Sequence, residues 1–227
     1  FVLITLLFLD FTGTLHPWMG WLAKIQLLPA ILAMNVGVVL FLVLLTLLAG
    51  RIYCSVICPL GVFQDVVSWI AGKRKKRRFS YSPAMNRLRY GVLILFIVAL
   101  IAGVGSLVAL LDPYSAFGRI ASNLLNPAYL WVNNLLADAA ERMESYAFYH
   151  TNIWIRSLSV LITAAVTLVV VSVLAWRNGR TYCNTVCPVG TFLGFLSRYS
   201  YLKPIINTDK CNSCGLCSRN CKASCIN

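Results

Sequence analysis

One cysteine motif occurs twice in this chain, and each copy directly follows a long apolar segment. The copies read YCSVICPLG and YCNTVCPVG, so both have the pattern Cys-x-x-x-Cys-Pro-x-Gly. Cys54 and Cys58 lie in the first copy and Cys183 and Cys187 in the second, with the same offset of 129 residues between corresponding cysteines. A chain with two such halves is expected to place its two pairs of thiols at equivalent positions in the fold.

The apolar segments predict an integral membrane protein. Hydrophobic residues make up 59% of the chain, charged residues 12%, and the mean hydropathy is +0.76, which lies outside the usual range of soluble domains. Residues 29–49, 90–111 and 157–176 are apolar and about as long as the roughly 20 residues that cross a bilayer. Residues 1–11 are predicted to be the end of a fourth helix. The expected fold is therefore all-α, with about four transmembrane helices.

The distribution of charge predicts which side of the membrane carries the cysteines. The net charge is +13, and 16 of the 20 basic residues flank the two motifs, whereas five of the seven acids lie in the other loops. Basic residues accumulate in cytoplasmic loops, so both motifs are expected to face the cytoplasm of a bacterial inner membrane. The basic run at residues 73–78 is predicted to contact anionic lipid headgroups, and nucleic acid is not an expected partner.

Both motifs are reached from the outer side of the membrane, which predicts a two-fold parallel repeat with the motifs facing each other. Five segments follow: the end of the first helix and an outer loop (1–28), a helix, the first motif and a basic cytoplasmic loop (29–89), a helix and an outer amphipathic segment (90–156), a helix and the second motif (157–203), and a partial ferredoxin-like module (204–227).

The proline in each motif explains how its second cysteine is presented. Proline disfavours helix at the preceding residue and suits the first position of a new helix. Cys58 and Cys187 are therefore expected at helix N-termini, where the dipole and free amides favour a thiolate. Together with Cys54 and Cys183 they form a candidate site for an iron-sulfur cluster or a metal. A redox-active dithiol and a purely structural role for four small buried side chains remain open alternatives.

A dense cysteine run near the end of the chain predicts a second kind of site. Cys211, Cys214, Cys217 and Cys221 have the spacing C-x2-C-x2-C-x3-C, in which the first three cysteines ligate one [4Fe-4S] cluster and the fourth serves another. A lysine stands where such runs usually have proline, so either Cys221 or Cys225 is the expected late ligand. The ligands that would complete two clusters are expected in a continuation of the chain.

The three cysteine segments YCSVICPLG, YCNTVCPVG and CNSCGLCSRNC together resemble the membrane-bound polyferredoxins of the NosR and NapH type. That resemblance implies electron transfer between a quinone or cytoplasmic donor and a partner redox enzyme. It also implies cluster ligation by Cys211, Cys214 and Cys217, with Cys221 serving a second cluster. The membrane-boundary motifs of this chain would then form a further redox site.

The leading hypothesis is an electron-transfer subunit rather than a stand-alone enzyme. A membrane assembly or regulatory protein with structural or sensing clusters is the alternative, and a metal-ion reductase is a third. His16 and His150 lie in predicted outer loops and are interpreted as surface residues. The sequence contains no glycine-rich phosphate loop and no nucleophile with a histidine on the same side, so kinase and hydrolase functions have no residues to support them.

Overall fold

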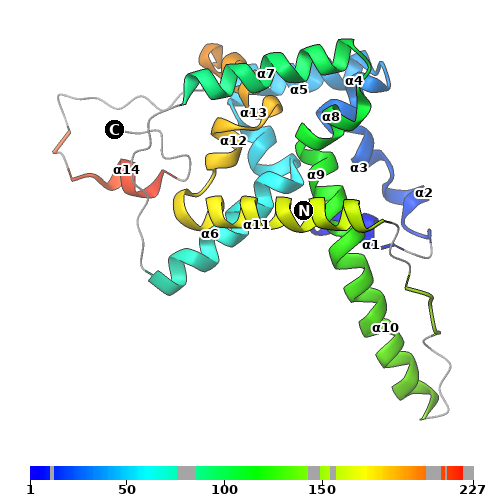
Figure 1. Cartoon of the computed structure of the whole chain (residues 1–227). Helices are drawn as coiled ribbons and strands as arrows, with labels where there is room; N and C mark the ends of the chain where they lie inside the picture. The colour runs from blue at the N-terminus through cyan, green and yellow to red at the C-terminus, as the bar shows by residue number, and fades with distance from the viewer. Residues whose placement is uncertain are drawn as a thin grey trace.

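The computed structural model describes residues 1–10, 13–75, 85–142, 149–153, 157–202, 211–212 and 214–221. All regular secondary structure within these ranges is helical (Figure 1). Cys225 lies outside the described residues, as do residues 76–78 of the basic run.

Short helices alternate with longer ones along the chain. The first part contains α1 (Val2–Leu9), α2 (His16–Met19), α3 (Trp21–Lys24), α4 (Leu27–Leu32), α5 (Val36–Ala49), the π-helix η1 (Tyr53–Ile57) and α6 (Pro59–Lys75). The second part contains α7 (Asn86–Ile101), α8 (Gly105–Leu111), α9 (Pro113–Ile120), the π-helix η2 (Ala121–Leu125), α10 (Asn126–Glu141), α11 (Leu158–Asn178), α12 (Thr181–Thr185), α13 (Pro188–Leu196), the 3-10 helix η3 (Ser197–Tyr199) and α14 (Leu216–Asn220).

Among the described residues, α11 is the helix whose length and composition suit a membrane span; it has 21 residues. The predicted span at residues 29–49 is instead divided into α4 and α5. Met34 has a left-handed backbone with φ of 53°, and the Asn35 side chain accepts a hydrogen bond from the Val38 amide at the start of α5. An asparagine at this position caps a new helix, so α5 begins here and is 14 residues long.

The predicted span at residues 90–111 is also divided. Gly103 has a φ of 71°, which lies in the left-handed region, and it separates α7 from α8. α8 ends before Asp112. The Asp112 side chain accepts a hydrogen bond from the Ser115 amide at 2.8 Å and caps α9. Hydropathy reveals apolar length but not these interruptions, because a single left-handed residue does not change the average.

The core lies where the two halves of the chain meet. α11 packs against α6 and α9, and α13 packs against α7 and α5. Large side chains from five of these helices are completely or almost completely buried: Leu42, Leu60, Phe117, Val171 and Leu193. Three of the four motif cysteines belong to the same buried cluster, so the motifs are part of the core and not of its edge.

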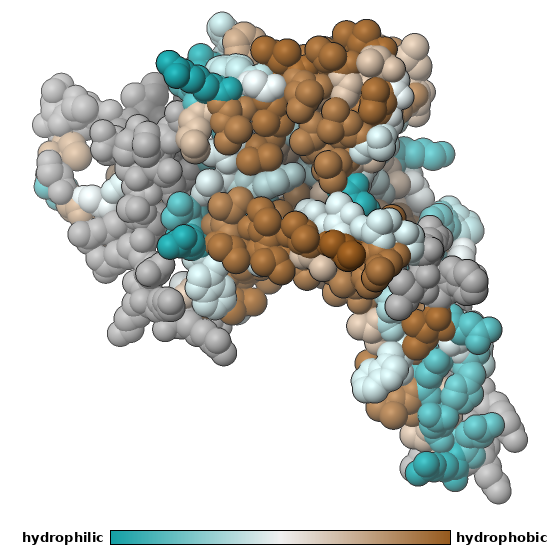
Figure 2. All heavy atoms as spheres, viewed as in Figure 1, coloured by the Kyte–Doolittle hydropathy of each residue, from teal (hydrophilic) through white to brown (hydrophobic). Residues whose placement is uncertain are grey.

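Much of the outer surface of the helices is apolar. Figure 2 shows hydrophobic side chains over α7 and α11, and polar side chains toward the end of α10. Ile94 and Ile101 of α7 are 62% and 81% exposed, and Ile162 and Val169 of α11 are 54% and 59% exposed. Contiguous apolar patches on a protein surface mark contact with lipid or another protein. These helices therefore present surfaces suited to contact with lipid or with another protein.

The amphipathic segment predicted after Asp112 is helical in the structure, and its location on the outer side of a membrane stays a prediction. α9, η2 and α10 follow one another without a break from Pro113 to Glu141. Leu130, Asn133 and Ala137 form the buried side of α10. Figure 1 shows α10 extending away from the other helices.

Candidate metal centre

The same backbone turn presents the second cysteine of each motif. The Cys58 amide donates to the Tyr53 carbonyl at 2.9 Å, and the Cys187 amide donates to the Tyr182 carbonyl at 3.0 Å. Each bond reaches back five residues, which makes a wider turn than an α-helix. The next residue in each motif is proline, and it begins α6 or α13. The prediction that these cysteines directly precede helix N-termini is therefore confirmed.

The glycine of each motif is required by a close approach of backbone segments. A Cβ atom at Gly61 would lie well inside 3.0 Å of the Cys54 carbonyl oxygen, a distance that real Cβ atoms essentially never show. A Cβ atom at Gly190 would meet the Cys183 carbonyl oxygen in the same way. Each new helix therefore folds back onto the turn that carries the first cysteine. This packing brings the first and second cysteine of a motif close together.

The four motif thiols are buried and close enough to influence one another. Burial raises the pKa of Cys58 well above its ordinary value, and the neighbouring Cys183 and Cys54 raise it further. Burial and the adjacent Cys54 raise the pKa of Cys183 to about 12. Burial is also the main cause of the raised pKa of Cys187, followed by the other three thiols. The structure thus brings together both pairs of predicted ligands.

The expected stabilisation of thiolates by helix N-termini is present, but it is smaller than the cost of burial. The Gly190 amide donates to the Cys187 sulfur at 3.3 Å, and the backbone amides of Leu60 and Gly61 lower the pKa of Cys58. Burial nevertheless dominates, and the pKa of both cysteines is raised. The amides at the helix N-termini therefore favour the thiolates, as expected, but burial outweighs them in the metal-free thiols. Binding of a cation would supply the missing stabilisation, since metal ligation deprotonates thiols.

Two arginines link the motifs to each other in a reciprocal way. Arg51 Nη1 donates to Asn184 Oδ1 at 2.8 Å, and Arg180 Nη1 donates to Ser55 Oγ at 2.7 Å. Each arginine lies just before one motif and binds the residue that follows the first cysteine of the other. The two contacts are equivalent, because Arg180 and Asn184 lie 129 residues after Arg51 and Ser55. Both guanidinium groups also lower the pKa of Cys54, although burial raises it more.

An ion pair holds the second motif against α6. Arg180 Nε donates to Asp65 Oδ1 at 2.7 Å, and its Nη2 pairs with Oδ2 of the same carboxylate. The two side chains are only 17% and 18% exposed. Sequence reasoning assigned Arg180 to membrane topology and did not find this pair, because the two residues are far apart in the chain.

Gln64 is a buried polar side chain beside the thiols. Its Nε2 atom lies 3.2 Å from Cys183 Sγ and 3.3 Å from the Leu60 carbonyl oxygen. Its Oε1 atom is buried and has no hydrogen-bond partner among the described residues. Val66 and Ile70 on the same helix are both more than 40% exposed. The core therefore receives Leu60 and Gln64, which sequence reasoning did not select.

The cysteine run near the end of the chain lies apart from the motif thiols. Cys211, Cys214 and Cys217 are exposed, and Cys221 is half-buried. Figure 1 shows α14, which contains Cys217, at one side of the helical body and away from α12 and α13. The structure therefore does not combine the two sets of predicted ligands into one site.

The four buried motif thiols are soft ligands, which suit either an iron-sulfur cluster or a zinc ion. A second group of possible ligands, Asp138, Glu141 and His150, is exposed.

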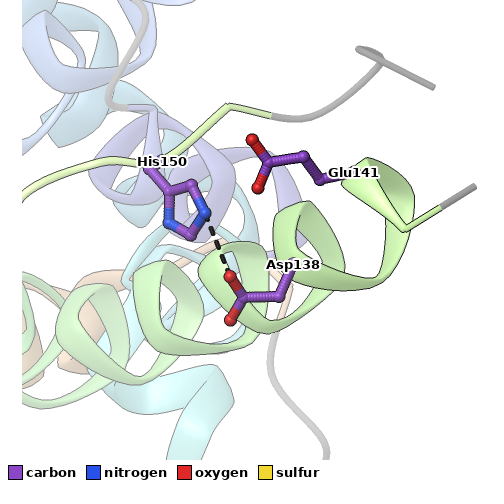
Figure 3. A group of neighbouring side chains, drawn as sticks. All are labelled: Asp138, Glu141 and His150. Atoms are coloured by element: carbon purple, nitrogen blue, oxygen red, sulfur yellow. Dashed lines mark ion pairs between the residues drawn. The ribbon is translucent and has the colours of Figure 1, made fainter. Parts of the chain in front are cut away.

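The acidic group with His150 lies on the surface and is shown in Figure 3. His150 Nε2 is 3.1 Å from Asp138 Oδ1, and both side chains are more than half exposed. The other histidine, His16, is 64% exposed. Both histidines are therefore surface residues, as predicted. The ion pair accounts for the arrangement of Asp138 and His150, and we assign no function to the group.

One protein family matches this chain at both cysteine motifs. Residues 31–78 and 158–207 match the 4Fe-4S binding domain family, and each match contains one motif and the apolar segment before it. The cysteine run that starts at Cys211 lies outside both matches. The prediction of 4Fe-4S clusters as the cofactor is thereby confirmed.

Curated relatives have related names. The ferredoxin-type protein NapH of Escherichia coli is 28% identical over 86% of this chain and 55% of its own length. The methylamine utilization ferredoxin-type protein MauN of Paracoccus denitrificans is 25% identical over 82% of this chain and 53% of its own length. MauN of Methylobacillus flagellatus is 27% identical over the same shares.

The resemblance to NapH-type proteins is thereby confirmed. The chain spans about half the length of the curated relatives that it matches. No solved structure matches it.

Proposed function

We propose that this chain, a NapH-like ferredoxin-type protein with 4Fe-4S clusters, carries electrons through a membrane-bound cluster held by its two cysteine motifs. The observation that carries the proposal is the burial of four mutually interacting thiols, two from each family-matched region. Buried thiols with raised pKa values are poor nucleophiles, which disfavours a thiol-exchange function. They are suitable ligands once a cluster supplies positive charge.

In this proposal Cys54, Cys58, Cys183 and Cys187 are the ligands at the membrane boundary. A bound 4Fe-4S cluster supplies one-electron chemistry. The chain supplies the surroundings that adjust its potential. Hydrogen bonds to ligand sulfurs and nearby positive charges favour the reduced cluster, and burial excludes water. The Gln64 side chain and the Gly190 amide would supply the hydrogen bonds, to Cys183 and Cys187 respectively. The two motif arginines would supply the positive charge.

The exposed cysteine run is proposed to hold the clusters that exchange electrons with soluble partners. Cys211, Cys214 and Cys217 would ligate one 4Fe-4S cluster, and Cys221 or Cys225 would provide a later ligand. Exposure of the first three residues supports this role, because electron exchange between proteins needs a cluster near the surface. The donor would be a quinone or a cytoplasmic protein, and the acceptor a partner redox protein.

We propose a multi-pass arrangement in a bacterial inner membrane, with the two halves forming a parallel two-fold repeat and the motifs at the cytoplasmic side. The reciprocal contacts of Arg51 and Arg180 support the repeat. The apolar exteriors of α7 and α11 support contact with lipid, and the concentration of basic residues near the motifs supports the orientation.

Anaerobic purification with iron and sulfide analysis and electron paramagnetic resonance tests the ligand assignment. We expect the Cys54→Ser and Cys183→Ser double variant to lose iron and one set of resonance signals. The matched Cys211→Ser and Cys214→Ser variant should lose a different set. Unchanged iron content in the first variant would show that the motif cysteines are not ligands.

A second measurement tests electron transfer separately from cluster binding. The complete protein should be reduced by a quinol or a low-potential donor and reoxidised repeatedly in steady state. The Cys214→Ser variant should slow this flow, since the exposed cluster would be incomplete. Normal flow in that variant would refute the electron path, and cluster binding without any turnover would favour a regulatory or assembly protein.

A further inference from the structure

The reciprocal contacts of the two motifs are broken at one position. Asp65 of the first half pairs with Arg180 of the second half. The residue at the same 129-residue offset from Asp65 is Gly194, which has no side chain. Arg51, which corresponds to Arg180, therefore lacks the carboxylate that its counterpart has. A guanidinium group in a comparable setting would need another anion.

A second arginine fills the position of the missing side chain. The Nη2 atoms of Arg51 and Arg89 both lie well inside 3.0 Å of the point where a Cβ atom of Gly194 would be. Arg89 comes from α7, which packs against α13, the helix that contains Gly194. Two guanidinium groups thus meet over one glycine. Two guanidinium groups this close repel each other, and an anion bound between or beside them would reduce the repulsion.

No anion within the described chain compensates these charges. Across the described ranges, neither Arg51 nor Arg89 forms an ion pair with a carboxylate. The Arg89 Nε atom is buried and has no hydrogen-bond partner there. A third cation is close, because Arg198 as well as Arg51 lowers the pKa of Arg89, after burial as the main cause. Burying the unsatisfied Arg89 donor beside the Arg51 guanidinium group is costly unless a ligand binds.

We propose that Arg51 and Arg89, over Gly194, bind a phosphate oxyanion. Guanidinium groups offer planar pairs of N–H donors that match phosphate oxygens, and a phosphate carries enough charge to compensate two cations. The site lies beside the end of α5 and the beginning of α7, at the predicted cytoplasmic boundary. The phosphate could come from an anionic lipid headgroup or from free inorganic phosphate, and the chemistry of recognition is the same.

The test compares two arginines on one helix. The full chain in detergent is titrated with inorganic phosphate by calorimetry. In nanodiscs of phosphatidylglycerol or phosphatidylcholine, retained lipid is counted by native mass spectrometry. We expect Arg89→Gln to weaken binding about tenfold or more, because it removes a charge-assisted contact. Arg87→Gln, which removes an exposed charge two residues earlier, should leave binding unchanged.

Restoring the missing carboxylate provides a second test. Gly194→Asp should abolish phosphate or headgroup binding without loss of thermal stability, because the new carboxylate can pair with the arginines as Asp65 pairs with Arg180. Gly194→Asn adds a side chain of the same size as Asp without the charge, and it should be less thermally stable than Gly194→Asp. Binding to phosphatidylglycerol alone would identify a lipid site, and binding to inorganic phosphate as well would identify a general phosphate site.

Two results would overturn the proposal. One is equal phosphate and lipid binding by the native chain, Arg89→Gln and Gly194→Asp. The other is the absence of both phosphate and lipid binding by the native chain. Iron content measured in every sample separates these outcomes from damage to the cysteine site.

Discussion

Replacement of the motif glycine by alanine tests the close backbone approach that positions the thiols. In Gly61→Ala the new Cβ would lie inside 3.0 Å of the Cys54 carbonyl oxygen. Carbon and oxygen atoms in tight contacts are normally about 3.3–3.6 Å apart. The contacted atom belongs to the backbone and not to a flexible side chain, so α6 and the preceding turn must separate. Cys54 and Cys58 would move apart as a result.

The expected free-energy change combines two opposing effects. Forcing an extra methyl group into a packed site costs about 1–3 kcal/mol. Alanine in place of glycine in a helix interior gains about 1 kcal/mol, which offsets part of this cost. We expect Gly61→Ala to be destabilised by up to about 2 kcal/mol. Gly72→Ala lies on the same helix with no atom within 4 Å of the new Cβ, so it should be stabilised by about 1 kcal/mol.

Thermal unfolding in detergent and iron analysis measure both consequences. The two alanine variants should shift the midpoint in opposite directions, and iron should fall in Gly61→Ala alone. Equal stability and full iron content in both variants would refute the reasoning, since the glycine would then not be required by packing. Gly190→Ala should behave as Gly61→Ala does, because its Cβ would meet the Cys183 carbonyl in the same way.

Three further predictions concern charge and ionisation. Asp65→Asn should lower the free energy of unfolding by about 2 kcal/mol, because Arg180 loses its partner; the loss is smaller than for a fully buried pair, since Arg180 is still 17% exposed. Adding Arg180→Gln should recover part of the loss in a double-mutant cycle. In iron-free protein at pH 8, iodoacetamide should modify exposed Cys214 far faster than Cys183, whose pKa of about 12 leaves roughly 1 thiol in 10,000 ionised; equal rates would contradict the burial. Burial raises the pKa of Asp112, so the folded chain binds its proton more tightly and stability should fall as the pH rises above 3.8; Asp112→Asn keeps the cap and should lose this fall, which thermal midpoints across pH would measure.

Sequence reasoning found the two cysteine pairs because the pattern that marks them is local. The spacing within each motif, the proline after the second cysteine and the apolar segment before the first all lie within a few residues. Cys58 and Cys187 are accordingly found at helix starts, as predicted. The helical interruptions at Met34 and Gly103 were missed, because they depend on the backbone conformation of single residues within uniformly apolar segments.

The amino-acid sequence by itself determined the helical class, the amphipathic segment after Asp112 and the four cysteines of the repeated motif. Only the tertiary structure decided what surrounds those cysteines. Burial raises the pKa of the thiols despite the helix N-termini, and Gln64 lies beside Cys183 through packing between distant segments. The pairing of Arg180 with Asp65, and the lack of such a partner for Arg51, likewise depend on residues more than 100 positions apart. Such contacts are set by packing between the two halves, which no local pattern records.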